Sequence, residues 1–133
     1  MSRILGVDFG TKRVGLAISD GLGVLASPLE VVPRESVVDY VKAVAIELEV
    51  TKIIVGLPTA LGGHEGASAD EARALGRDLH YATELPVVYH DERFTSRMAE
   101  TALLGKGMKR RDRREKVDKI AAAIILQDYL DNQ

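Results

Sequence analysis

The chain has 133 residues, of which 46% are hydrophobic and 29% are charged, a balance typical of one globular domain spanning residues 1–133. The absence of cysteine excludes disulfides and thiolate metal sites, and the absence of a signal-peptide pattern or a bilayer-length apolar run predicts a cytoplasmic protein without a membrane partner. The formal net charge of −2 excludes a protein that is basic throughout, because the positive charge is concentrated in residues 106–119.

The first third of the chain predicts three strands. Residues 4–9 and 14–19 are apolar runs separated by a tight turn, and large and small side chains alternate in the second run. Residues 24–32 are expected to form a third strand, in which Pro28 marks a bulge or a sheet edge. The short connection between the first two runs predicts a hairpin, and therefore antiparallel pairing.

The rest of the chain alternates between helical and strand-like patterns. Apolar residues recur at three- and four-residue steps over residues 35–48, which predicts a helix, and residues 53–55 form a short apolar run typical of a central strand. The further elements are a helix around residues 72–82, a strand from residue 86 into 91–93, a helix over 95–104 and a last helix over 117–130. This order predicts an α/β fold with a mixed five-stranded sheet flanked by helices.

Carboxylates stand at the ends of three of these elements. Asp8 lies in an apolar stretch at the end of the first strand, Asp91 and Glu92 end the last strand, and Asp118 falls in the first turn of the last expected helix. The carboxyl ends of strands in an α/β sheet are where ligands usually bind. A buried charge is costly unless something pairs with it, so the sequence predicts a partner for Asp8 at this edge.

A divalent cation is the partner that best explains grouped carboxylates. Magnesium prefers oxygen ligands, takes one or two carboxylates and leaves positions open for phosphate. One or two such ions can support hydrolysis of a phosphodiester bond. We therefore expect Mg²⁺ or Mn²⁺ to be held by Asp8, Asp118 and one of the two acids that end the last strand, Glu92 or Asp91.

Each acid also has a purely structural explanation. Asp8 could accept hydrogen bonds from the turn that follows it, and the acids that end the last strand could cap the next helix or pair with Arg93. Asp118 could complement the N-terminus of its helix. His90 beside the acids and His64 in a glycine-rich loop could assist the chemistry, but packing is the preferred explanation for His90 and solvent exposure for His64, and their roles stay open.

The basic segment, residues 106–119, holds eight basic and three acidic residues, whereas the rest of the chain holds 10 basic and 17 acidic residues. An acidic body with one basic segment predicts a local contact with a polyanion. The segment directly precedes the acid-bearing helix, and arginine is well suited to phosphate. We therefore expect nucleic-acid binding in preference to a passive solvated surface. The candidates are Lys109, Arg110, Arg111, Arg113 and Arg114.

Four ordered blocks of the sequence resemble those of the YqgF/RuvX family and cover nearly the whole chain. They are VDFGTKRVGLAISD, VGLPTALGGHEG, DERFTSRMAE and VDKIAAAIILQDYL. The resemblance implies an RNase H-like fold and a divalent-metal-dependent nuclease that acts on structured nucleic acid. The metal-binding and catalytic carboxylates that it implies are Asp8, Glu92 and Asp118. The phosphate contacts that it implies are Lys12, Arg13 and Arg93.

The resemblance leaves the substrate open between an rRNA precursor, cut at the 5′ end of pre-16S rRNA during ribosome biogenesis, and a four-way DNA junction. RuvC-type resolvases carry a glutamate at the end of the strand after the first helix, whereas residues 54–58 of this chain contain no acid. We therefore favour rRNA processing, and a junction resolvase would be expected to act as a homodimer. A non-catalytic RNA-binding module is a further alternative. An ATPase of the actin and sugar-kinase type is disfavoured, because one such domain cannot form the ATP cleft.

Overall fold

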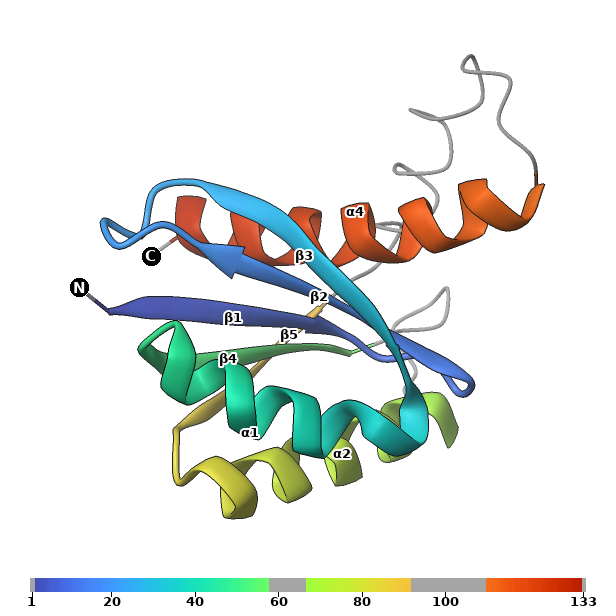
Figure 1. The fold of residues 1–133 in the computed structure, drawn as a ribbon, viewed down its shortest axis with the longest axis horizontal. Coiled ribbons are helices and arrows are strands. Elements are labelled where there is room, and N and C mark those ends of the chain that lie inside the picture. The colour runs from blue at the N-terminus through green and yellow to red at the C-terminus, as the bar shows by residue number, and fades with distance from the viewer. Residues whose placement is uncertain (1, 58–66, 92–109, 133) are drawn as a thin grey trace.

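A computed structural model of the protein describes residues 2–57, 67–91 and 110–132, with the backbone alone described for residues 67–68 and 110–119. The expected helix over residues 95–104 lies outside this range. Figure 1 shows the arrangement of the elements. The strands are β1 (Arg3–Asp8), β2 (Arg13–Ser19), β3 (Ala26–Pro33), β4 (Val50–Leu57) and β5 (Val87–Asp91). The helices are α1 (Val37–Glu47), preceded by the 3-10 turn η1 (Arg34–Ser36), then α2 (Ala67–Thr83) and α4 (Arg110–Asp131).

The five strands form one mixed sheet, as the sequence predicted, and their order in it is β3-β2-β1-β4-β5. β1 pairs antiparallel with β2 and β2 with β3, whereas β1–β4 and β4–β5 are parallel. Both expectations for Pro28 are confirmed, because β3 is an edge strand and its pairing with β2 shifts register beside this residue, between Leu16 and Ala17. The sheet therefore has the mixed pairing that a hairpin followed by strand–helix units produces.

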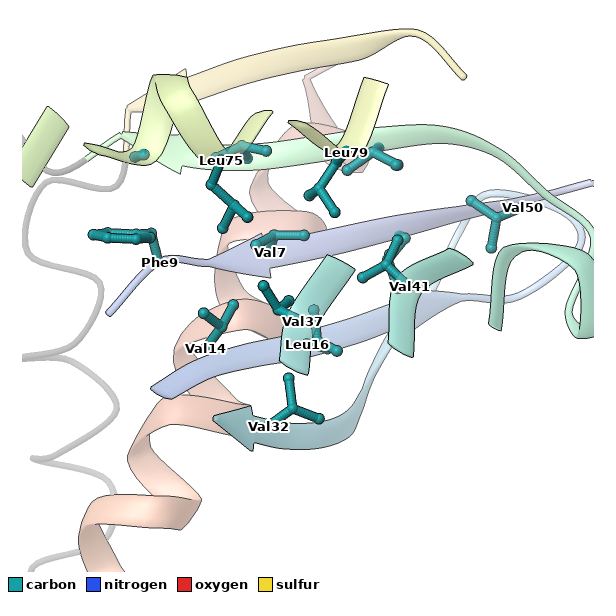
Figure 2. Close-up of a cluster of buried hydrophobic side chains, with 14 of the residues drawn as sticks. Val7, Phe9, Val14, Leu16, Val32, Val37, Val41, Val50, Leu75 and Leu79 are labelled. Atoms are coloured by element: carbon teal, nitrogen blue, oxygen red, sulfur yellow. The ribbon is translucent and has the colours of Figure 1, made fainter. Parts of the chain in front are cut away.

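Helices cover both faces of the sheet (Figure 1): α1 and α2 lie on one face and α4 on the other. Alternation along each strand divides the core between these layers. Val7 and Leu16 belong to the cluster against α1 and α2, which Figure 2 shows, whereas Ile54 belongs to the cluster packed under α4. Burial stabilises apolar side chains. The positions of the apolar residues along each strand therefore determine which side chains face α1 and α2 and which face α4.

Gly6 of β1 explains how closely α4 approaches the sheet. A Cβ atom on Gly6 would lie 2.9 Å from Cβ of Leu126 and 3.2 Å from the carbonyl oxygen of Ala122. Any larger side chain at this position would push the helix outward. Because side chains alternate along a strand, Asp8 projects from β1 on the same α4 face as Gly6.

Two boundaries differ from the sequence prediction. α4 begins at Arg110, not at residue 117, so much of the basic segment is helical, and Asp118 is the ninth residue of the helix instead of lying in its first turn. The apolar period begins only where the helix packs on the sheet, and Figure 1 shows its first turns extending beyond the strands. β4 runs over Val50–Leu57, longer than the predicted 53–55. Among the described residues, no helix is long and apolar enough to cross a membrane.

Candidate functional site

The parallel strands β1, β4 and β5 end at one edge of the sheet, which we call the carboxyl edge. Asp8 ends β1 and Asp91 ends β5, and the register places Asp8 beside Gly56 and Leu57 beside Asp91. β4 lies between the two acids, so their strands are two spacings, or about 10 Å, apart. The fold thus brings the acids of the first and last strands to one edge, with one intervening strand.

Asp8 is one of the few buried polar residues among those described, with 8% of its surface exposed. Its cross-strand neighbours are Gly15 on β2 and Gly56 on β4. Directly opposed residues in a sheet have Cβ atoms about 4.5–5.5 Å apart, so two glycines leave the carboxylate without a neighbouring side chain on either strand. A carboxylate at this depth suits an oxygen-seeking cation or a phosphate held through one.

Asp91 lies at the same edge as Asp8 but on the opposite face of the sheet. In β5, Val88 packs with the α4 cluster and Tyr89 with the α1 and α2 cluster. Tyr89 lies so close to Gly76 of α2 that a Cβ there would collide with its hydroxyl group, and this hydroxyl donates to the Arg73 carbonyl at 3.1 Å. By alternation the exposed Asp91 shares the Tyr89 face, away from Asp8.

Asp118 is placed by the backbone of α4. It precedes Ala122 by four residues, so both belong to one face of the helix. Ala122 lies against Gly6, and α4 runs antiparallel to β1 (Figure 1). The four helix residues from Ala122 to Asp118 advance about 6 Å, and the two strand residues from Gly6 to Asp8 advance about 6.6 Å, both toward the carboxyl edge. The two aspartates are therefore at matching levels on facing elements.

The other predicted metal ligand, Glu92, lies outside the described residues. Within the described part of the chain, no three His, Asp or Glu side chains come close enough together to hold a metal ion. Of the expected carboxylates, the structure places the side chains of Asp8 and Asp91 and the backbone of Asp118. Two observations support a metal site at this edge. Asp8 is buried, and Asp118 lies on α4 at the same height along β1 as Asp8.

Cations stand beside the carboxyl edge in the turn that follows Asp8. A Cβ at Gly10 would collide with the Arg13 carbonyl oxygen, so the tight connection from β1 to β2 requires glycine. Lys12 in this turn is exposed and Arg13 is half-buried. The sequence interpretation missed Arg34, whose backbone N–H donates to the Lys12 carbonyl at 2.9 Å. Its only sequence signal is that it follows the end of the third strand.

The Arg34 guanidinium lies 5.7 Å from the ring centroid of Phe9, which directly follows Asp8. The cation is thereby held near the end of β1 by an aromatic ring as well as by its own backbone hydrogen bond. The other predicted cations divide in two groups. Those in the first turns of α4, with helical backbone, are Arg110, Arg111, Arg113 and Arg114. Those outside the described residues are Lys109 and Arg93.

The arginines of α4 oppose the electrostatics of their own helix. Positive side chains in a first turn face the positive end of the helix dipole, which costs about 0.3–1 kcal/mol for each charge. Helix stability alone therefore does not explain why Arg110 and Arg111 open this helix. Arginine is suited to phosphate, and helix N-termini in general favour anions, so the start of α4 stays a candidate for phosphate binding.

The structure gives His90 a partner that the sequence did not indicate. Its Nε2 lies 2.6 Å from an oxygen of Asp128 in α4. Nothing in the sequence links these residues, which are 38 positions apart, because the link depends on how β5 and α4 pack. His64 lies outside the described residues.

Comparison with known proteins places this chain in context. The profile of the RuvX family, described as Holliday junction resolvase, matches residues 2–132. A protein of Lactococcus lactis is 41% identical over 135 residues, covering 98% of this chain and 94% of that protein. A protein of Porphyromonas gingivalis is 39% identical over 135 residues, covering 99% and 98%. Both relatives carry the name "Putative pre-16S rRNA nuclease".

Two solved structures share the fold at low sequence identity. RuvC of T. thermophilus in complex with a Holliday junction substrate aligns with a TM-score of 0.56 and 17% identity, covering 98% of this chain and 94% of that chain. The fowlpox virus Holliday junction resolvase aligns with a TM-score of 0.55 and 14% identity, covering 98% and 99%. These likenesses confirm the predicted RNase H-like fold.

Proposed function

Because the chain belongs to the RuvX family, we propose that it is a divalent-metal-dependent nuclease that processes the 5′ end of pre-16S rRNA. The observation that carries this proposal is the position of Asp8. It is a buried carboxylate at the carboxyl edge, flanked by glycines on both neighbouring strands and level with Asp118 on the facing helix. A buried carboxylate at the end of a strand suits a cation and a phosphate held through it.

The second carboxylate from the last strand is Glu92 in preference to Asp91. Asp91 lies on the face of the sheet opposite to Asp8. This leaves Glu92, the next residue in the sequence, as the acid that we assign to the site. The longer glutamate side chain also suits the two-strand separation between β1 and β5.

Asp8, Glu92 and Asp118 are the residues that would hold Mg²⁺ or Mn²⁺, and oxygen donors fit either ion. When bound, such an ion lowers the pKa of water and stabilises negative charge on phosphodiester oxygens. Lys12, Arg13 and Arg93 would bind phosphates next to the cleaved bond. The basic residues at the start of α4 would hold the strand farther from the carboxyl edge, through its backbone and not through its bases.

A junction resolvase is the second candidate function, favoured by the family description. It would require a homodimer, so that two sites cut opposed strands. The position next to Asp8 weighs against it, because Gly56 stands at the end of the strand after the first helix, where RuvC-type resolvases carry glutamate. A non-catalytic RNA-binding module would keep the basic helix but would gain nothing from burying Asp8.

The test is cleavage of a labelled pre-16S rRNA fragment and of a four-way DNA junction, each with Mn²⁺, Mg²⁺ or a chelator. We expect metal-dependent cutting of the rRNA, lost in Asp8→Asn and kept in Asp39→Asn, which changes an exposed acid on α1. Preferred cutting of the junction by a dimeric protein would establish the resolvase. Tight RNA binding without cutting under any metal would establish the binding module.

A further inference from the structure

The end of β5 is tied to α4 by a hydrogen-bonded pair. His90 Nε2 lies 2.6 Å from Oδ2 of Asp128, and the other oxygen of this carboxylate, Oδ1, accepts a hydrogen bond of 3.2 Å from Asn132. Asn132 also donates to the Asp128 carbonyl at 2.7 Å. The Asp128 side chain is therefore held from both sides, and it presents one oxygen to the strand.

The His90 ring is further fixed by aromatic and cationic neighbours. It meets the ring of Tyr129 edge-on, with centroids 6.3 Å apart and planes at 90°. Tyr129 in turn accepts a hydrogen bond of 3.0 Å from Nζ of Lys52 in β4. Strands β4 and β5 and helix α4 thus each contribute a side chain to one connected group, the His90–Asp128–Tyr129–Lys52 cluster.

This cluster contributes little to overall stability. The Asp128 side chain is 59% exposed and that of His90 is 22% exposed, and such partly solvated pairs are weak because water screens them. Its importance lies in its location. α4 lies mainly over β3, β2 and β1, whereas β5 is the far edge strand, so its end has few other attachments to this helix among the described residues.

We propose that His90 and Asp128 are positioning residues that set the distance between the strand leading into Glu92 and the helix carrying Asp118. This inference rests on the proposed function. His90 lies in β5 and precedes Glu92 by two residues in the sequence, so a tie at His90 acts on the strand end that leads into Glu92. Asp128 is on the same rigid helix as Asp118. A tie between the two elements therefore fixes the relative placement of two carboxylates that come from distant parts of the chain.

The experiment compares Asp128→Ala with Asp131→Ala, which removes the same charge from the next exposed acid of α4. Mn²⁺ alone is titrated calorimetrically into each protein, and kcat and KM are measured on the rRNA fragment. For Asp128→Ala we expect Mn²⁺ affinity and kcat each to fall about tenfold, with KM little changed, because small displacements of ligands are costly. The melting temperature should change by a few degrees at most. Asp131→Ala should match the wild type.

Three further variants separate positioning from direct chemistry. His90→Phe keeps a ring against Tyr129 but removes the hydrogen bond, so it should match Asp128→Ala. The double variant should be no worse than either single change, because both remove one interaction. Asp128→Asn retains an acceptor oxygen and should recover most of the lost affinity. Amide hydrogen exchange at β5 should be faster in the two single variants that lack the bond.

Several outcomes would overturn the inference while leaving the nuclease intact. Unchanged Mn²⁺ affinity and kcat in Asp128→Ala would show that the tie positions nothing. Equal losses in Asp131→Ala would reveal a general charge effect. A far larger loss in His90→Phe than in Asp128→Ala would show that His90 acts directly on substrate. A wild-type protein that neither binds Mn²⁺ nor cleaves would instead overturn the proposed function, and this inference with it.

Discussion

Asp8 of β1 pairs with Gly56 of β4, so the residue beside the buried carboxylate carries no side chain. Both residues lie on the α4 face, since Ile54, two residues before Gly56, belongs to the cluster under α4. The backbone φ of Gly56 is not positive, unlike that of Gly23 at 71°, so a side chain here would cause no backbone strain. Gly56 is therefore not required by a left-handed backbone conformation.

Gly56→Glu is expected to create a second carboxylate beside Asp8. Without metal the two buried negative charges should repel, and the variant should lose about 1–3 kcal/mol of unfolding free energy. Mn²⁺ should restore more stability to this variant than to the wild type, because it neutralises both acids. Thermal unfolding with and without Mn²⁺ tests this, with Gly56→Gln as the uncharged control. Equal metal responses in the two variants would contradict a cation site next to Asp8.

Glu92→Gln should abolish cleavage, whereas Asp91→Asn should retain it. The physical reason is the alternation of β5, which places Asp91 on the face away from Asp8. A lost ligand should reduce kcat by about a hundredfold or more, since outer partners alone account for 10–100-fold. The measurement is single-turnover cleavage at saturating Mn²⁺. If Asp91→Asn were the inactive variant, the strand would have to twist or bulge after Tyr89.

The sequence was sufficient to predict most of the sheet, because its strands follow simple patterns. The alternation in β2 and the apolar run of β4 reflect burial on one or both faces, and Pro28 correctly indicated an irregular edge. The start of α4 could not be predicted, because the prediction relied on periodic apolar residues. Arg, Lys and Glu favour helices, but a segment made of them contains no such period. Figure 1 shows the first turns of this helix extending beyond the strands, and its described apolar residues packed on the sheet come from Ala122 onward.

The candidate site was predictable only in part, for a different reason. Asp8 stands out in sequence because a charge interrupts an apolar run. Its neighbours Gly15 and Gly56 and the faces of Asp91 and His90 depend on strand order and register, which a single sequence does not determine. The contacts of Arg34 with Phe9 and of His90 with Asp128 join residues far apart in the chain. Such pairs require the packed layers to be known.

The double variant Arg110→Glu/Arg111→Glu should weaken RNA binding and flatten its salt dependence. Each lost phosphate contact should reduce the slope of log K against log salt by about 0.7–0.9. Glutamates at a helix N-terminus favour the helix, so weaker binding could not be ascribed to its unfolding. The control is Lys42→Glu/Arg77→Glu, an equal charge change at exposed residues of α1 and α2 on the other face. Equal slopes for both double variants would exclude a specific role for α4.

The turn between β2 and β3 should lose stability in acid. Its Asp20 carboxylate accepts hydrogen bonds from the N–H groups of Val24 at 2.8 Å and Leu25 at 3.2 Å. These bonds hold the pKa of Asp20 below its ordinary value of 3.8. Because the folded pKa is lowered, the stabilisation is present above pH 3.8 and is lost as pH falls through the folded value. The melting temperatures of wild type and Asp20→Asn should therefore differ at pH 6 and converge below pH 3.8.

Gly6→Ala tests the close approach of α4 that brings Asp118 level with Asp8. The added Cβ would meet Leu126 at 2.9 Å, so the helix or strand must move. Overpacking should cost about 1–3 kcal/mol, partly offset by about 0.4–1 kcal/mol from the loss of glycine entropy in the unfolded chain. Denaturant unfolding measures the net loss. Because the displaced helix carries Asp118, Mn²⁺ affinity should fall as well. A variant as stable as the wild type, with unchanged Mn²⁺ affinity, would show that α4 does not depend on this glycine for its position.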